Sequence, residues 1–522
     1  MNFNNPNSIV KDLTFNKKAS TKIMKGVNKL ARAVSSTLGA SGKCVIYEDT
    51  MGQPVITKDG VTVAESVVLM DPVENIGATL IKEAASKTVE EAGDGTTTAT
   101  VLAHSILQSY NEYEGWETLR NIKNGIDYSK DKVIEYLEKI KKPADEDLIK
   151  HVARISCNND EILGNLIAEA YEKVGKNGVV LMEGSKDEQT HIEIVDGVEL
   201  HGCKIKSPHL LTDKDNQKAI LDDPYILIID GPVENVRNIQ VILEFIIKGG
   251  KSLLIMADVG QQPFATLLMN KVKGNIKVNV IDLPGFGPSK RDTLEDLALL
   301  TGAKVISEEL GDDMDMLKPD VLGRAKKAVT DKRSTVLTVD KDPKLLKERI
   351  KSVEKKIKET KDKYWKGLHK NRLAMLSGLV GIIKVGAYSK VEQKEKMDRV
   401  EDALYATKAA IEEGIVPGGG IALLNAAQRV ENHGGAGELI LLSAIQAPFE
   451  KVLDNANMIE RTAWAEGWEE GEGIDVTCGC TKDMVEVGIV DPLLVTKSAL
   501  NHAVSVAKTI MSADCVISNV RE

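Results

Sequence analysis

Aromatic side chains are scarce in this sequence of 522 residues, where Phe, Trp and Tyr together make up 4%. Hydrophobic residues nevertheless reach 42%, so the cores must be built from Val, Ile, Leu and Ala. An excess of basic residues is also absent. The formal net charge of -10 argues against a dedicated nucleic-acid binder, since such proteins carry a basic face. No run of about 20 apolar residues occurs, so no membrane-spanning helix is predicted.

Cysteine is also sparse, and its spacing excludes the common metal sites. Six cysteines are scattered over the chain, and only Cys478 and Cys480 lie close together. No second pair and no nearby His completes a zinc site. We therefore expect six reduced thiols and a cytoplasmic location; a redox role for the close pair is the less favoured alternative. Residues 1–11 agree with this expectation, because they have neither the apolar core of a signal peptide nor the arginines of a transit peptide.

Helical patterns dominate both ends of the chain, whereas the middle is different. At the ends, apolar residues recur at helical spacing. The predicted helices cover residues 76–92, 96–109, 402–413 and 495–511. In the middle, short β-branched runs alternate with helical stretches, which is typical of an α/β layer with buried strands. The predicted strands cover residues 225–230, 252–257 and 276–281.

The helical ends that flank an α/β middle indicate that the ends form one domain and that the middle is an insertion. Segments near 141–196 and 381–412 would then be the connections, with a hinge on each side of the insertion. The charged residues 344–370 carry their apolar residues on one stripe, which predicts a surface helix. No internal repeat is visible.

The strongest chemical signal is the motif Gly93-Asp94-Gly95-Thr96-Thr97-Thr98. Its glycines let the backbone approach a ligand, and its threonines add hydroxyl donors at a helix start, where free N–H groups favour phosphate. Asp94 suits a magnesium ion that bridges the phosphates. A plain Gly-rich helix start with threonine caps is the alternative. The motif is not a P-loop, because every Gly-Lys pair lacks the glycine five positions earlier.

Further motifs are weak one by one but form a recognisable ordered set. Besides the glycine and threonine motif, they comprise residues 57–60, 284–287, 300–302, 305–310, 399–404, 412–420 and 488–492. Together these segments closely resemble the group I (GroEL-type) chaperonins, the sixty-kilodalton heat-shock family, over nearly the whole chain.

The resemblance implies an α+β multidomain fold, in which a mostly helical equatorial domain is split by an intermediate domain and an α/β apical domain. The equatorial domain would comprise residues 1–140 and 413–522 and would bind ATP and make the ring contacts. The intermediate hinge domain would comprise residues 141–196 and 381–412. The apical domain, residues 197–380, would bind clients and a co-chaperonin.

The resemblance also implies an ATPase that uses ATP, a magnesium ion and a potassium ion. Asp94 would bind magnesium. Asp402 would orient or deprotonate the attacking water, with Asp59 assisting. Supplying Asp402 from a hinged segment would delay hydrolysis until the hinge closes.

The nucleotide would be held by further matched residues. The resemblance implies that Gly95, Thr96, Thr97 and Thr98 hold the phosphates and that Leu38 and Gly39 cover them. Backbone oxygens of Thr37 and Lys58 would bind the potassium ion. Gly419 and Asp491 would contact the ribose, and Ile489 and Asp475 the adenine. Asp475 departs from the family, which has asparagine there. A carboxylate can still accept a hydrogen bond from the adenine amino group, but it lacks the amide donor.

Apolar residues surround most of residues 235–248, which is more than packing on a sheet requires. Core packing explains some of them. The resemblance implies an apical groove for unfolded client proteins and for a lid-like co-chaperonin. The matched groove residues are Ile205, Leu210, Leu243, Phe264, Leu268 and Met269.

The resemblance further implies a homo-oligomer, built as one or two seven-membered rings, without nucleic acid or membrane partners. Lys390 stands where relatives have a glutamate that pairs with a neighbouring subunit, so we expect that bridge to be absent. The sequence ends at Arg521 and Glu522 without the Gly-Met-rich tail of many relatives.

Two other classes of function stay open. A ring-forming, client-binding homologue without ATP turnover would have no need for Asp59, Asp94 and Asp402 together. A monomeric small-molecule kinase would leave the apolar excess near residues 235–248 unexplained.

Overall fold

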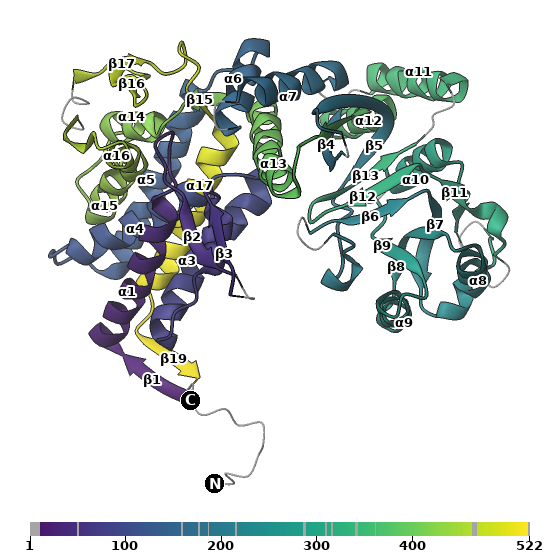
Figure 1. The fold of residues 1–522 in the computed structure, drawn as a ribbon, viewed down its shortest axis with the longest axis horizontal. Coiled ribbons are helices and arrows are strands. Elements are labelled where there is room, and N and C mark those ends of the chain that lie inside the picture. Colours follow the sequence, from purple (N-terminus) through teal and green to yellow (C-terminus); the bar gives the residue numbers. More distant parts are fainter. Residues whose placement is uncertain are drawn as a thin grey trace, which may run out of the picture. The chain divides into compact units, whose positions relative to one another are not determined.

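The computed structural model of the chain forms two compact units (Figure 1). We call residues 1–168 and 395–522 the split unit, and residues 169–394 the inserted unit. The structure describes residues 11–49, 52–157, 160–175, 178–185, 187–213, 217–284, 289–307, 311–314, 317–339, 343–360, 362–461 and 467–519. Parts of the predicted motifs at 284–287 and 305–310, and both ends of the chain, lie outside these ranges. Among the helices within them, none is both long and apolar enough to cross a membrane.

Four long helices form the core of the split unit. They are α1 (Asn16–Ser35), α3 (Pro72–Ala92), α4 (Thr96–Glu112) and α17 (Leu493–Met511), and each packs against the others or a shared neighbour (Figure 1). Their contacts are made by small and aliphatic side chains. A Cβ atom added to Gly77 would lie 2.4 Å from the carbonyl oxygen of Ile23, so α1 and α3 approach at backbone distance. This close approach shows how the unit is built with few aromatic residues.

The predicted helices are confirmed, although they extend beyond the predicted ends. α3 begins at Pro72 rather than at residue 76, because the Asp71 side chain accepts hydrogen bonds from the backbone N–H groups of Val73 and Glu74. A fifth long helix, α5 (Leu119–Ile140), also belongs to the split unit. Shorter helices complete it: α2 (Gly60–Ser66), α6 (Glu146–Ser156), α14 (Ile421–Arg429), α15 (Ala436–Ala444) and α16 (Ala447–Asn455). Two helices run across the division between the units, α7 (Glu161–Val174) and α13 (Lys390–Glu413).

The strands of the split unit form two-stranded antiparallel ribbons. β1 (Lys11–Phe15) pairs with β19 (Cys515–Asn519), so the two ends of the described chain meet. The other ribbons are β2 (Val45–Glu48) with β3 (Pro54–Thr57), β15 (Ile415–Pro417) with β18 (Val490–Pro492), and β16 (Glu472–Asp475) with β17 (Cys480–Asp483).

The inserted unit contains two sheets. The first has the order β10-β7-β8-β9, with β11 on β7, and its parallel strands confirm the predicted α/β layer. Its strands are β7 (Pro224–Val233), β8 (Ser252–Val259), β9 (Lys277–Ile281), β10 (Val305–Ile306) and β11 (Gly323–Arg324). The second sheet has the order β4-β14-β5-β13-β12-β6. Its strands are β4 (Val179–Gly184), β5 (His191–His201), β6 (Ala219–Asp222), β12 (Lys327–Thr330), β13 (Ser334–Thr338) and β14 (Leu379–Val385).

Both faces of the parallel sheet are buried. Leu227 and Leu253 point into a core with α8 (Gln240–Gly249) and α9 (Gln261–Val272), whereas Ile226 and Leu254 belong to a core with α10 (Ser289–Thr301). Alternate residues of each strand therefore face opposite cores, which explains the continuous apolar runs in the sequence.

The prediction of one surface helix over residues 344–370 is wrong. Two helices form there, α11 (Pro343–Glu359) and α12 (Lys363–Ser377), and they pack against each other. Arg372 of α12 is 4% exposed and makes two hydrogen bonds to Asp296 of α10, whose side chain is fully buried. Arg349 of α11 pairs with the same carboxylate at 2.5 Å. This ion network ties three helices together, which the stripe of apolar residues did not reveal.

Candidate functional site

The connection between α3 and α4 presents Asp94 between two glycines. Gly93 and Gly95 have φ angles of 83° and 94°, which favour glycine. A Cβ atom at Gly93 would lie 2.3 Å from Cβ of Tyr405, and one at Gly95 would lie 2.8 Å from a methyl group of Val495. The backbone is therefore held tightly on both sides of Asp94, whose carboxylate accepts the N–H of Gly95 at 2.5 Å.

The start of α4 is suited to an anion. Gly95 is its N-cap residue and provides no side-chain cap, so the first-turn N–H groups, including those of Thr97 and Thr98, are available to a ligand. Thr96 is buried, whereas Thr97 and Thr98 are half-buried. The alternative prediction of a threonine-capped helix start is wrong, because the residue in the capping position is glycine.

Asp59 lies next to this helix start. It caps α2, where its carboxylate accepts hydrogen bonds from the N–H of Val61 and from the N–H and hydroxyl of Thr62 at 2.6 to 3.0 Å. A Cβ atom at Gly60 would lie 2.3 Å from the hydroxyl of Thr97, so α2 begins in contact with α4. Asp59 is thus fixed by its own helix beside the threonines.

Asp402 projects from α13. Residue 402 keeps exposed surface, but removal of water from its surroundings and the charges of Asp94 and Asp59 raise the pKa of its carboxyl well above the usual range. Burial likewise raises the pKa of Asp94, and the charge of Asp59 adds to this effect. The structure therefore brings the three predicted carboxylates into electrostatic contact.

Asp491 is a fourth carboxylate of the same group. It lies on β18 opposite Val416 of β15, and it accepts hydrogen bonds from the N–H groups of Gly419 and Gly420, where α14 begins. Burial, together with the charge of Asp94, raises the pKa of Asp491 to about 7. Gly419 and Asp491, which were both predicted to contact the ribose, thus lie in direct contact.

We call Asp59, Asp94, Asp402 and Asp491 the acidic cluster. Among the described residues, no basic side chain forms an ion pair with any of them, and no group of three or more His, Cys, Asp or Glu is arranged to hold a metal ion by itself. Carboxylates of this cluster could hold magnesium, which commonly takes one or two carboxylates and completes its shell with phosphate oxygens and water. The repulsion within the cluster would be relieved by such an ion.

The turn that follows α1 contains Thr37, Leu38 and Gly39. The side chain of Asn455, at the end of α16, donates to the carbonyl oxygens of Ser35 and Leu38, both at 2.9 Å. Sequence reasoning missed Asn455, and a single buried asparagine gives no signal in a sequence. The side-chain hydrogen bonds of this turn are made with α1 and α16. Lys58, which was predicted to bind potassium together with Thr37, is exposed.

The predicted adenine-side residues lie on and beside the β16–β17 ribbon. The carbonyl oxygen of Ile489 accepts the N–H of Gly418 at 2.9 Å, which joins it to the turn that holds Asp491. Asp475 accepts hydrogen bonds from the N–H and hydroxyl of Thr477, and Lys482 lies 3.3 Å away. Burial opposes ionisation, but these partners lower the pKa of Asp475 overall.

The prediction of six reduced thiols is wrong for one pair. Cys478 and Cys480 form a disulfide, because the turn between β16 and β17 brings their Cα atoms within 5.4 Å. Cys44, Cys157, Cys203 and Cys515 are free.

The predicted client residues differ in exposure. Met269 is 59% exposed, and Ile205, Leu243, Phe264 and Leu268 are half-buried. Leu210 is fully buried against α9, so it offers no surface in this structure. The apolar excess of α8 is exposed at Val241, Phe245 and Ile247, and Val272 of α9, which was not predicted, is 68% exposed. We call these exposed side chains of α8 and α9 (Val241, Phe245, Ile247, Met269 and Val272) the exposed apolar set.

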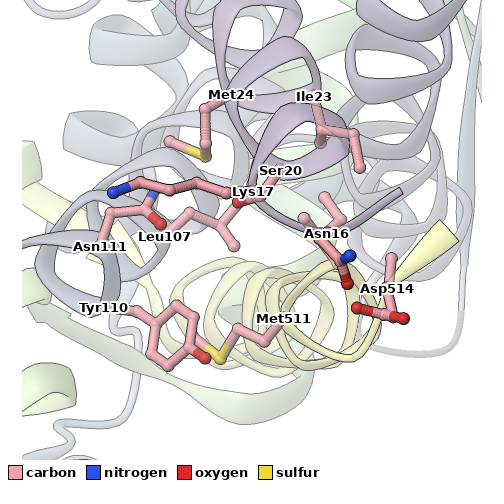
Figure 2. Close-up of a pocket in the computed structure, with 12 residues that line it drawn as sticks. Asn16, Lys17, Ser20, Ile23, Met24, Leu107, Tyr110, Asn111, Met511 and Asp514 are labelled. Atoms are coloured by element: carbon pink, nitrogen blue, oxygen red, sulfur yellow. The ribbon is translucent and has the colours of Figure 1, made fainter. Parts of the chain in front are cut away.

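A pocket of about 280 Å³ lies elsewhere in the split unit (Figure 2). It is lined by the start of α1, by Leu107, Tyr110 and Asn111 near the end of α4, and by residues around the end of α17. Leu107 is roughly 16 Å along the helix from Thr96 at 1.5 Å per residue. This pocket contains none of the predicted site residues and is separate from the acidic cluster.

A helical unit interrupted by an α/β insertion, with an acidic cluster at an uncapped helix start, is the architecture of a chaperonin subunit. Residues 30–521 match the TCP-1/cpn60 chaperonin family, and the chain belongs to this family. The fold is similar to that of chaperonin gp146 from bacteriophage EL 2 (Pseudomonas aeruginosa), solved in the presence of ATP-BeFx. Crystal form II gives a TM-score of 0.73 at 22% identity, covering 98% of this chain and all of that one. Crystal form I gives a TM-score of 0.66 at 22% identity, covering 98% and 99%.

The predicted chaperonin family and the GroEL-like fold class are confirmed, and the protein is a chaperonin, a member of a family that assists protein folding. The three domain boundaries and the roles of the site residues stay predictions.

Proposed function

We propose that this chaperonin hydrolyses ATP at the acidic cluster and uses the reaction to bind and release unfolded clients within a homo-oligomeric ring. One observation carries the proposal. Carboxylates with raised pKa values surround a helix start whose N–H groups have no side-chain cap. Such a helix start favours phosphate, and the carboxylates favour the cation that accompanies it.

The phosphates would be bound by the first-turn N–H groups and hydroxyls of α4, with Leu38 and Gly39 on the other side. Asp94 would hold magnesium, and backbone oxygens of Thr37 and Lys58 would hold potassium. Bound magnesium would neutralise phosphate charge and would offset the repulsion among the carboxylates.

Asp402 is the proposed general base. Its raised pKa makes its ionised form a stronger base than an ordinary aspartate, so it can accept the proton of the attacking water more readily. Asp59 cannot turn freely, because three hydrogen bonds hold its carboxylate to α2. It would therefore help to position the water rather than receive its proton.

The remaining matched residues would hold the nucleoside. Gly419 and Asp491 would contact the ribose, and Ile489 would contact the adenine. Asp475 would accept a hydrogen bond from the adenine amino group, and its partners Thr477 and Lys482 keep it ionised for that purpose.

The exposed apolar set on α8 and α9 would bind clients. Exposed Val241, Ile247 and Met269 leave large aliphatic side chains in water, which a soluble protein normally avoids unless they form an interaction site. A flexible methionine suits varied partners. A lid-like co-chaperonin would compete for the same residues.

The ribbons support assembly of the ring. Ile46 and Ile56 of the β2–β3 ribbon are 68% and 66% exposed, and Phe15 and Ile517 of the β1–β19 ribbon are 51% and 59% exposed. Two-stranded ribbons have open edges that can pair with another chain. We propose that these ribbons meet between neighbouring subunits, and that seven subunits close each ring.

Substitution Asp402→Ala tests the proposed chemistry. We expect ATP turnover to fall by about 100-fold or more, the usual contribution of a general base, while binding of a fluorescent ATP analogue stays within a few-fold. Glu412→Gln, an exposed carboxylate on the same helix, is the matched control and should leave turnover unchanged. Persistent turnover in Asp402→Ala would exclude Asp402 as the base. A wild-type protein that binds the analogue but does not hydrolyse ATP would support the non-hydrolysing homologue instead.

Native mass tests the ring. Seven chains of 56.8 kDa give about 398 kDa, and two stacked rings give about twice that mass. Replacing Ile46 and Ile56 together by aspartate should shift the mass towards the single chain, whereas Val272→Asp in the inserted unit should not. A wild-type protein that remains at 56.8 kDa would refute the ring.

A further inference from the structure

The tip of the β16–β17 ribbon carries two sulfur atoms that no step of the proposed cycle uses. Cys478 and Cys480 are both exposed, and they form a disulfide across a single glycine. Their Cα separation of 5.4 Å is within the range in which a disulfide can form without moving the backbone. The hairpin turn therefore holds the two sulfurs together as a pair that solvent can reach.

Polar groups surround this tip and favour one turn geometry. Arg461 donates to the carbonyl oxygen of Gly479 at 2.5 Å. Gly479 has a φ of 69°, and a Cβ atom there would lie 2.7 Å from the Arg461 guanidinium. The sulfur of Cys478 lies 3.6 Å from the Asp475 carboxylate, so a thiol at this position could donate to it. A thiol at Cys478 thus has a carboxylate acceptor, and Arg461 holds the backbone of the turn.

The other cysteines lack these properties. Burial raises the pKa of both the Cys157 and the Cys203 thiol to about 12, which leaves them almost entirely protonated and inert. Cys44 is exposed but unpaired, and Cys515 is half-buried. Among the described cysteines, only the Cys478–Cys480 pair combines access with a partner.

We propose that Cys478-Gly479-Cys480 is a dithiol–disulfide site that exchanges with low-molecular-weight thiols. In the reducing direction, a thiolate attacks one sulfur, the Cys478–Cys480 bond breaks, and its electron pair leaves on the other sulfur, which takes up a proton. A second thiol displaces the first sulfur. One disulfide and two thiols thus become two cysteine thiols and one small-molecule disulfide. The reverse reaction, driven by the small-molecule disulfide, re-forms the bond.

The state of this site affects the ribbon that carries Asp475. Ile474 and Met484 of the ribbon pack in one cluster with Ile421, the first residue of α14. The N–H of Gly420, directly before Ile421, bonds to Asp491. The disulfide closes the ribbon tip covalently, whereas the dithiol leaves it held by hydrogen bonds alone. The reduced ribbon should therefore be less ordered.

Redox titration of the full chain tests the exchange. The protein is equilibrated with graded ratios of reduced and oxidised glutathione, unfolded in an alkylating agent, and digested for mass spectrometry. We expect the peptide with Cys478 and Cys480 to gain or lose two alkyl groups together, whereas Cys44 forms only mixed disulfides. In Cys480→Ser, Cys478 should behave like Cys44. A pair that forms only mixed disulfides, or that stays in one state at every ratio, would overturn the proposal.

Hydrogen exchange of residues 472–483 tests the effect on the ribbon. We expect faster amide exchange in the reduced protein than in the oxidised one, and no such difference in Cys480→Ser. Equal exchange in the two states of the wild type would refute the effect on the ribbon. Neither measurement involves ATP, so both results are independent of the proposed hydrolysis.

Discussion

Substitution Asp491→Asn removes one charge from the acidic cluster and leaves an oxygen that can still accept the N–H groups of Gly419 and Gly420. In the folded protein, the pKa of Asp491 is raised from 3.8 to about 7. The folded state therefore binds a proton more tightly than the unfolded state between these pH values. The stability that this proton contributes is complete below about pH 4 and is lost as the pH rises through 7.

The size of the effect follows from the same shift. A difference of about 3 pKa units corresponds to about 4 kcal/mol at most, because one unit is about 1.4 kcal/mol. Only about 2 of these units fall between pH 5 and pH 8, which limits the change in this window to about 2.7 kcal/mol. Relaxation of the cluster and water entry reduce this value, so we expect the free energy of unfolding of the wild type to fall by about 1 to 2.5 kcal/mol between pH 5 and pH 8 relative to Asp491→Asn.

The assay is urea unfolding of both proteins at several pH values, monitored by circular dichroism, without nucleotide and with a chelator. The difference between the proteins is the informative quantity, because groups outside the acidic cluster titrate equally in both. Parallel stability profiles would refute the reasoning, as would a wild type that gains stability relative to the variant as the pH rises. Magnesium and an ATP analogue should reduce the difference, since a bound cation offsets the charge.

Three further substitutions test the surroundings of the site and the inserted unit. Gly95→Ala should destabilise the split unit by about 1 to 3 kcal/mol and abolish binding of the ATP analogue, because Gly95 has a φ of 94° and an added Cβ would lie 2.8 Å from Val495. Gly434→Ala is the control: its φ is 79° but the space around it is open, so binding should stay intact. Asn455→Ala leaves the carbonyl oxygens of Ser35 and Leu38 without their donor, so urea unfolding should show a loss of about 1 to 3 kcal/mol, and an unchanged midpoint would contradict this. Arg372→Met should destabilise the inserted unit by about 3 kcal/mol in thermal unfolding, because Asp296 stays buried, whereas Arg291→Met at an exposed pair should change stability by less than about 1 kcal/mol.

The elements that the sequence predicted well are those set by local pattern. The strands around Tyr225, Ser252 and Lys277 are apolar on both faces, and this pattern arises only when helices cover the sheet on both sides. The glycines around Asp94 and the threonines after it also signal a tight turn before a helix. These features are set by residues close together in the chain, so they can be recognised in the sequence.

Features that depend on distant residues could not be predicted. The link between Asn455 and Leu38 joins segments far apart in the sequence, and so does the ion pair of Arg372 on α12 with Asp296 on α10. Leu210 was predicted at a surface but is buried, because α9 packs over it. The raised pKa values in the acidic cluster likewise need the folded arrangement of four segments.

The pairing of β1 with β19 has a consequence for biosynthesis. Lys11 lies opposite Asn519, so the first described strand has to wait for the last before its ribbon can form. The inserted unit is continuous from residue 169 to 394 and can fold while the ribosome is still working, whereas α1, α3 and α4 emerge early but gain α17 only near the end. During that interval the apolar sides of these early helices lack their final partner. A protein that assists the folding of others therefore passes through its own stage of exposed apolar surface, and shielding of the nascent chain should matter most before residues 493–519 have been made.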